Sequence, residues 1–166
     1  METLHTIRKW LDKIVGTICI LLFALMVVVG SYQIITRFIF NNPSTISEEL
    51  LTYSFAWMAM FATAYVFGKR DHMRMTFVVD KLAPAQRKVL EIVLEILVIA
   101  FAVIVLIYGG FNIMGLTMTQ KTASLGVMMG QVYAVVPISG ILIAIYGILN
   151  VSDLCKGYER KEEEEK

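Results

Sequence analysis

The chain has 166 residues, of which 57% are hydrophobic and 17% are charged, and its formal net charge is +1. Soluble domains have about 45–50% apolar and about 25% charged residues, so a soluble domain of this size could not bury the excess apolar surface. The Lys and Arg residues lie in short connections and at the ends rather than on one basic face, which excludes nucleic-acid binding.

Four long stretches without Asp, Glu, Lys or Arg can each cross about 30 Å of hydrocarbon, which takes roughly 20 helical residues. We therefore predict an all-α integral membrane protein in which residues 1–155 form one four-helix transmembrane domain. Residues 156–166 are a mixed charge run and are predicted to be a disordered tail. The predicted spans cover about 14–36, 48–68, 89–117 and 124–152.

The N-terminal residues 1–13 resemble the charged region of a signal peptide, but the apolar run that follows is too long and has no small-residue cleavage site. We expect the first span to be retained. Cys19 within it and Cys155 after the last span should lie far apart in depth, so no disulfide or redox pair is predicted.

The first connection runs from Arg37 to Ser47, and its Asn-Asn-Pro sequence should end the first helix. Thr45 and Glu48 have the spacing of a capping box for the second helix. Glu48 and Glu49 have two possible roles. They stabilise the positive end of the helix dipole, or one of them pairs with Arg37.

The second connection, residues 69–88, is the longest polar stretch between spans, and its apolar middle predicts a short interfacial helix. Its basic residues should contact anionic lipid headgroups. In the third helix, Glu91 and Glu95 either lie at headgroup depth or face protein. The sequence leaves this choice open.

Small residues recur in the fourth span, where Gly126, Gly130 and Ala134 form a small-xxx-small stripe that permits close helix contact, although such stripes are common by chance. Gly140 and Ala144 form a second candidate stripe. Pro137 should bend this helix or remove one of its backbone hydrogen bonds.

The orientation follows from the distribution of basic residues, since cytoplasmic segments hold the excess of Lys and Arg. Thirteen of the 15 lie in the N-terminal segment, the second connection and the tail, which leaves Arg37 and Lys121 on the other side. Both termini and the second connection are therefore predicted to be cytoplasmic.

No span carries an ionisable residue at its centre, as an ion-driven carrier normally would. The two histidines, His5 and His72, lie in predicted cytoplasmic segments and cannot hold a midplane haem. Hydrolase and nucleotide-binding motifs are absent, so we predict no catalytic, cofactor or metal site and no enzyme activity. Gln33, Thr63 and Asn112 are expected to form hydrogen bonds between helices. This pattern favours a protein that assists another membrane subunit.

Four segments in order carry a resemblance to a known family: Arg37 to Leu50, Trp57, Gly68 to Met75, and Asp80 to Pro84. Their order and spacing over about 50 residues, together with the length and the four spans, resemble the small membrane (Q) subunit of tripartite ATP-independent periplasmic (TRAP) transporters. The resemblance implies a three-component, sodium-coupled uptake system of the bacterial inner membrane. Its substrate would be a small carboxylate such as sialic acid or a C4-dicarboxylate.

In such a system a periplasmic substrate-binding (P) protein captures the carboxylate, and a large multi-span (M) subunit moves it by an elevator-like motion. The resemblance implies that this chain supports the scaffold of the large subunit, and that its outward connections lie where the P protein docks. Membrane lipids are further expected partners. The candidate partner or lipid contacts are Arg37, Glu48, Glu49, Trp57, Lys69, Arg70, His72, Arg74, Lys121, Gly126 and Gly130.

Two alternatives belong to other functional classes. The glycine stripe of the fourth span is compatible with a self-contained channel or exporter formed by several copies of the chain. A membrane anchor for a redox enzyme would require a bound haem or quinone.

Overall fold

The structure is a computed structural model that describes residues 2–69 and 84–155. Helices account for nearly all of these residues. The third span is built from three consecutive helical segments, and the fourth from two. The elements are α1 (Glu2–Phe38), α2 (Thr45–Gly68), α4 (Pro84–Phe101), the π-helix η1 (Ala102–Gly109), α5 (Gly110–Thr117), α6 (Met129–Tyr133) and α7 (Val135–Cys155).

Four helical stretches are long and apolar enough to cross a membrane: Thr6–Phe38, Thr45–Lys69, Val89–Thr117 and Met129–Ser152. The predicted all-α, four-span fold is thus confirmed. The first stretch begins earlier than predicted, and the fourth begins at Met129 rather than at residue 124. The predicted interfacial helix falls mainly on residues 70–83, which, like the tail, lie outside the described residues.

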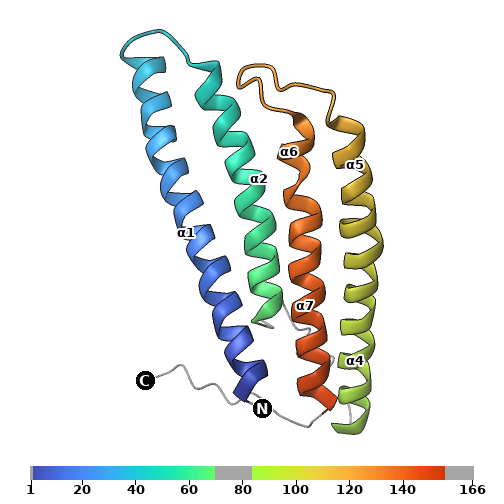
Figure 1. The fold of residues 1–166 in the computed structure, drawn as a ribbon. Coiled ribbons are helices and arrows are strands. Elements are labelled where there is room, and N and C mark those ends of the chain that lie inside the picture. Colours follow the sequence, from blue (N-terminus) through green and yellow to red (C-terminus); the bar gives the residue numbers. More distant parts are fainter. Residues whose placement is uncertain (1, 70–83, 156–166) are drawn as a thin grey trace, which may run out of the picture.

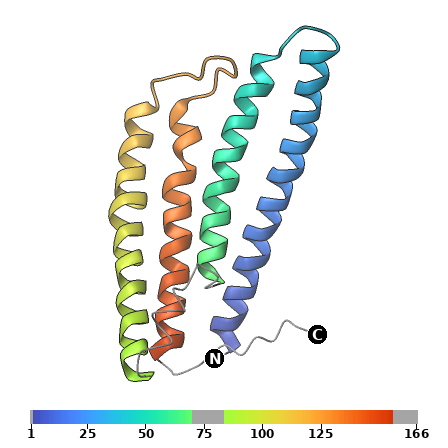
Figure 2. The same cartoon turned by 180° about the vertical axis from the view of Figure 1, so that it is seen from behind.

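The four spans stand in a curved row rather than around a central axis. Going along the row, α1 contacts α2, α2 contacts α7, and α7 contacts α4 and η1 (Figure 1). The same order is seen from behind (Figure 2). The spans differ in how much of their most apolar 18-residue segment is buried. Half of that segment is buried in the fourth span, against 6% in the first and third spans. The outer helices of the row therefore expose most of their apolar surface.

Successive helices run in opposite directions, so alternate connections lie together at one end of the helix axes. We call the end with residues 39–44 and 118–128 the loop end. The opposite end, where α1 begins and α7 finishes, is the terminal end. At the loop end, α2 begins after an N-cap at Ser44, whose side chain accepts from the Ser47 amide at 3.4 Å. The predicted cap at Thr45 is one residue too late, so Glu48 does not take part in a capping box.

Glycines let α7 approach its neighbour closely. A Cβ on Gly140 would lie 2.7 Å from Leu106 Cβ, and one on Gly147 would lie 2.5 Å from Ile99 Cγ1. Contact at the second predicted stripe is thus confirmed at Gly140. The first stripe is wrong as a helical face, because Gly126 lies in the loop before α6 with a φ of +68°. Gly130 does pack closely, with its Cβ position 2.6 Å from the Met114 carbonyl oxygen.

The third and fourth spans each contain an irregular segment, η1 in the third and the break at Ala134 in the fourth. The α-helical hydrogen bonding is interrupted at Ala134, between α6 and α7, since Pro137 has no N–H to donate to the Tyr133 carbonyl. The predicted effect of Pro137 is thus confirmed. A Cβ on Gly110, just after η1, would lie 2.9 Å from the Pro137 Cδ atom.

The polar groups within the spans do not join helices as predicted. Thr63 donates to the Ala59 carbonyl of its own helix at 2.8 Å, and Asn112 is exposed. Neither Asn112 nor Gln33, both of which are described, has a side-chain bond to another helix. Among the described residues, the polar contacts between side chains of different helices lie instead where the spans begin and end.

Candidate functional site

At the loop end, the Glu49 side chain of α2 binds the loop that joins α5 to α6. Its Oε2 atom accepts hydrogen bonds from the backbone amides of Ser124 and Leu125 at 2.7 and 2.8 Å. Its Oε1 atom accepts from the Ala123 amide at 3.1 Å and from the Tyr53 hydroxyl at 2.8 Å. We call this arrangement the Glu49 clasp.

The geometry of the clasp follows from helical spacing and carboxylate chemistry. Tyr53 lies one turn after Glu49, so its hydroxyl reaches the carboxylate on the same helix face. A carboxylate has about four acceptor positions on two oxygens, enough for three amides and one hydroxyl. Hydrogen bonds to an ionised acceptor are about twice as strong as neutral ones. The clasp therefore joins α2 to loop residues that follow Glu49 by 74 to 76 positions in the sequence.

The clasped loop is also ordered by its own bonds. Thr122 donates its amide to the Val127 carbonyl at 2.8 Å, and its buried hydroxyl accepts from the Val127 amide at 3.0 Å. Lys121 and Met128 form an isolated β-bridge. The positive φ of Gly126 allows the turn between them. The predicted contact residues Lys121 and Gly126 are thus exposed parts of a fixed loop.

Trp57, another predicted contact, is partly buried between α2 and the fourth span. Its indole nitrogen donates to the Val132 carbonyl at 3.0 Å, and its ring centroid lies 6.0 Å from that of Phe61. Val132 belongs to the short helix that ends just before the Ala134 break. Trp57 therefore joins α2 to the irregular part of the fourth span.

Arg37 and Glu48 are both exposed at the loop end. The Arg37 guanidinium lies 6.0 Å from the centroid of the adjacent Phe38 ring. No ion pair joins Arg37 to Glu48 or Glu49, all three of which are described, so the predicted pairing is wrong. Glu49 is instead bonded to the loop, which lies on the other side of α2 from α1.

The basic candidates of the second connection are only partly described. The Lys69 ammonium lies 4.9 Å from the centroid of the Tyr65 ring, within the range of a cation–π contact. Arg70, His72 and Arg74 lie outside the described residues.

At the terminal end, polar side chains join α1, α4 and α7. Arg8 donates to the side-chain oxygen of Asn150, whose amide nitrogen donates to Glu95 Oε1 at 3.2 Å. The Tyr146 hydroxyl donates to Asp12 Oδ1 at 2.8 Å. Arg8 is only 7% exposed, and Asn150 and Tyr146 are fully buried. Glu95 therefore faces protein, which resolves one choice that the sequence left open.

Sequence reasoning missed most of this network, which we call the terminal-end network. Arg8 and Asp12 were treated as part of a charged N-terminus, and Asn150 as the end of an apolar span. One signal was available, because Arg8 and Asp12 are four residues apart and so share a helix face.

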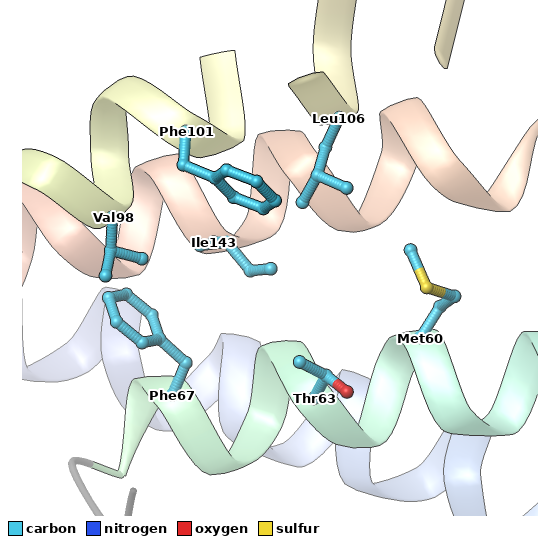
Figure 3. A pocket seen from close by; sticks show the side chains of 7 residues that line it. All are labelled: Met60, Thr63, Phe67, Val98, Phe101, Leu106 and Ile143. Carbon is cyan, nitrogen blue, oxygen red and sulfur yellow. The ribbon is translucent and has the colours of Figure 1, made fainter. Parts of the chain in front are cut away.

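An apolar groove of about 210 Å³ lies between α2 and the third span, with α7 beneath it (Figure 3). Its single side-chain hydroxyl, that of Thr63, already donates within α2. A groove with this lining suits alkyl groups rather than a carboxylate. The lining residues are Met60, Thr63, Phe67, Val98, Phe101, Leu106 and Ile143.

Comparison with known proteins gives consistent results. Residues 26–157 match the family described as tripartite ATP-independent periplasmic transporters, DctQ component. The sialic acid TRAP transporter small permease protein SiaQ of Vibrio cholerae is 30% identical over 158 residues, which are 92% of this chain and 88% of the relative. A TRAP transporter small permease protein of Haemophilus influenzae is 28% identical over 135 residues, 81% of each chain.

A longer relative shows the same similarity within a larger protein. The sialic acid TRAP transporter permease protein SiaT of Haemophilus influenzae is 23% identical over 143 residues, which are 86% of this chain but 22% of SiaT. These findings do not favour the alternative of a self-contained channel. With four membrane-spanning helices and a family match over most of its length, the chain belongs to the DctQ family, the small permease subunits of TRAP transporters.

Proposed function

We propose that this chain is the accessory subunit of a sodium-coupled TRAP transporter that takes up a small organic carboxylate, either sialic acid or a C4-dicarboxylate. The name of the Vibrio relative supports sialic acid as the first substrate to test. The subunit lies in the bacterial inner membrane, with the loop end facing the periplasm. The concentration of Lys and Arg in the N-terminal segment, the second connection and the tail supports this orientation.

The observation that carries the proposal is the row of helices. A row has no enclosed central axis along which a solute could cross the bilayer. Its outer helices expose large apolar side chains at membrane depth, including Ile20 and Val28 on α1 and Leu97 and Ile104 on the third span. Such a surface suits lateral packing against a larger membrane subunit, whose immobile scaffold it would support.

The polar side chains inside the chain support the same role. The Glu49 clasp bonds α2 to the α5–α6 loop, and the terminal-end network bonds α1 and α4 to α7. Both lie at the ends of the spans rather than at the midplane, where a carrier usually needs its charges. The match to about one fifth of SiaT further supports a large permease as the partner. The basic residues that follow α2 would contact lipid phosphates, each contributing about 1 kcal/mol.

The test is reconstitution in proteoliposomes with the large subunit, the soluble P protein and this chain, with each component omitted in turn. We expect sialic acid or C4-dicarboxylate uptake only when all three are present with an inward sodium gradient. Uptake that is unchanged when this chain is omitted would contradict the proposal. Solute flux through vesicles that contain this chain alone would favour the homo-oligomeric channel.

The face that binds the large subunit can be located with bulky substitutions. Ile20→Trp enlarges the exposed face of α1, and Ile104→Trp enlarges that of η1. Fluid lipid adapts to the extra volume, whereas a packed helix interface does not. We expect one of the two substitutions to reduce co-purification of the large subunit. If both variants retain it fully, the outer helices of the row are not the contact surface.

A further inference from the structure

We propose that Glu49 is a positioning residue for docking: it holds the loop Lys121–Met128 in one conformation, and this fixed loop is the surface that the P protein binds. The inference rests on the proposed function and on the orientation given there. It assigns docking to one of the two segments at the loop end, and it gives a role to the one carboxylate that bonds α2 to the α5–α6 loop in the described residues.

The loop has a bonded inner side and an exposed outer side. Its inner side is held by the three amide bonds to Glu49 and by the buried Thr122. Its outer side combines one cation with small and apolar groups. The exposed residues are Lys121, Ala123, Gly126, Val127 and Met128.

A loop of this kind is suited to recognition. Exposed loops on a rigid scaffold commonly carry binding residues. Binding to a loop that is already fixed avoids the entropy cost of ordering it. Without the clasp, the loop would retain its internal bonds but would lose the three hydrogen bonds that join its backbone to α2.

The other segment at the loop end is built differently. The turn at residues 39–44 is held by local bonds, such as those from the Asn42 amide to the Thr36 carbonyl and from the Ser47 amide to Ser44. No side chain of another described element bonds to it. The clasp is therefore a feature of the α5–α6 loop, and its loss should affect that loop alone.

The charges at the loop end indicate the kind of partner. The loop Lys121–Met128 has one ionisable side chain, that of Lys121, and this side chain is exposed. The loop surface itself is therefore positively charged. We infer that the docking surface of the P protein is acidic around a small apolar patch.

The test compares Glu49→Gln with the matched control Glu48→Gln. Both remove one negative charge from the first turns of α2. Glutamine at position 49 places an amide NH₂ against backbone N–H donors, so it cannot reproduce the clasp. Glu48 has an exposed side chain, and its loss leaves the clasp intact.

Two readouts are needed, both on the complex of this chain with the large subunit in nanodiscs. Hydrogen exchange of a peptide covering residues 121–128 reports whether the loop is held. The affinity of the purified P protein for the nanodisc complex reports docking. Glu49→Gln should accelerate exchange of the loop and weaken docking about tenfold or more. Glu48→Gln should change neither, with docking within about twofold of the unmodified complex.

Three further variants separate positioning from general stability. Trp57→Phe removes a different bond between α2 and the fourth span, so assembled complexes should dock normally. Lys121→Glu alters the exposed face of the loop without touching the clasp. It should weaken docking about tenfold with unchanged exchange, and it keeps the test valid if Glu49→Gln fails to fold. Lys9→Glu, an exposed charge reversal at the terminal end, should have no effect.

The outcomes distinguish the inference from the proposed function. If Glu49→Gln releases the loop but docks normally, or if Lys121→Glu docks normally, the loop is not the docking surface. If Glu49→Gln leaves loop exchange unchanged, Glu49 does not position it. If the unmodified complex fails to assemble or to bind the P protein at all, it is the proposed function that fails.

Discussion

Gly68, at the end of α2, lies directly against the ring of Tyr146 on α7. A Cβ at position 68 would be 2.6 Å from two carbons of that ring, which is fully buried and is held by its bond to Asp12. The contact fixes how closely α2 and α7 approach at the terminal end.

We therefore expect Gly68→Ala to destabilise the protein by about 1–3 kcal/mol, the usual cost of overpacking a core. The Tyr146 ring cannot move aside without losing its hydrogen bond to Asp12. The measurement is the free energy of unfolding in mixed micelles with increasing SDS.

The matched control is Gly115→Ala in α5, where nothing lies within 4 Å of the new methyl group. Alanine there should be neutral or slightly stabilising, because glycine is a poor helix former. Equal destabilisation by both substitutions would mean that helix propensity, and not the ring contact, decides the result.

Removal of the Arg8 side chain should cost about 2 kcal/mol of unfolding free energy, because Arg8 is buried and its charged hydrogen bond to Asn150 joins α1 to α7. Lys9→Ala removes the same charge from an exposed neighbouring position and should have little effect. A double-mutant cycle of Arg8→Ala with Asn150→Ala should show non-additivity. Strictly additive effects would contradict a direct interaction.

Trp57→Phe should lower the free energy of unfolding by about 0.5–1.5 kcal/mol, since phenylalanine retains the ring packing but cannot donate to the Val132 carbonyl. Trp10, the other tryptophan of the chain, is 63% exposed, so Trp10→Phe serves as the control. If the two substitutions had the same effect, the indole bond would contribute nothing measurable.

Arg37→Ala and Glu48→Ala should have additive effects on stability, within about 0.3–0.5 kcal/mol, because the two exposed side chains form no ion pair. The double-mutant cycle is measured by unfolding in the same micelles. A favourable coupling above that range would show that the two charges do interact in the membrane.

The fold class was predictable because the membrane imposes it. Uncharged stretches of about 20 residues must become helices in hydrocarbon, where every backbone group needs an internal partner. The interruption of the fourth span by Pro137 was also predictable, because the missing N–H of proline acts on its own turn of the helix. The start of the fourth helix was not, because residues 124–128 are apolar enough for a span but are drawn into the loop by bonds to Glu49 and Thr122.

The role of Glu49 shows why the candidate site was only partly predictable. Its position in the first turns of a helix predicted a favourable interaction with the helix dipole, and nearby Arg37 offered a partner of opposite charge. The structure instead directs the carboxylate to amides about 75 residues later in the sequence. No local sequence pattern indicates which backbone amides a carboxylate will bind, because every non-proline residue has a backbone N–H donor. Asn150 and Arg8 were missed for a different reason: both bonding groups are side chains, but the residues lie 142 positions apart in the sequence.

The row of helices also determines the footprint of the chain in the plane of a bilayer. Neighbouring packed helices lie about 8–10 Å apart, so three spacings make a plate about 25–30 Å wide and only one helix thick. If the plate tilted within its own plane, one outer helix would be pulled out of the hydrocarbon and the other would be pushed deeper. A tilt about the long axis of the row displaces the outer helices little. A partner attached along the broad face would therefore resist the first tilt but remain free to make the second.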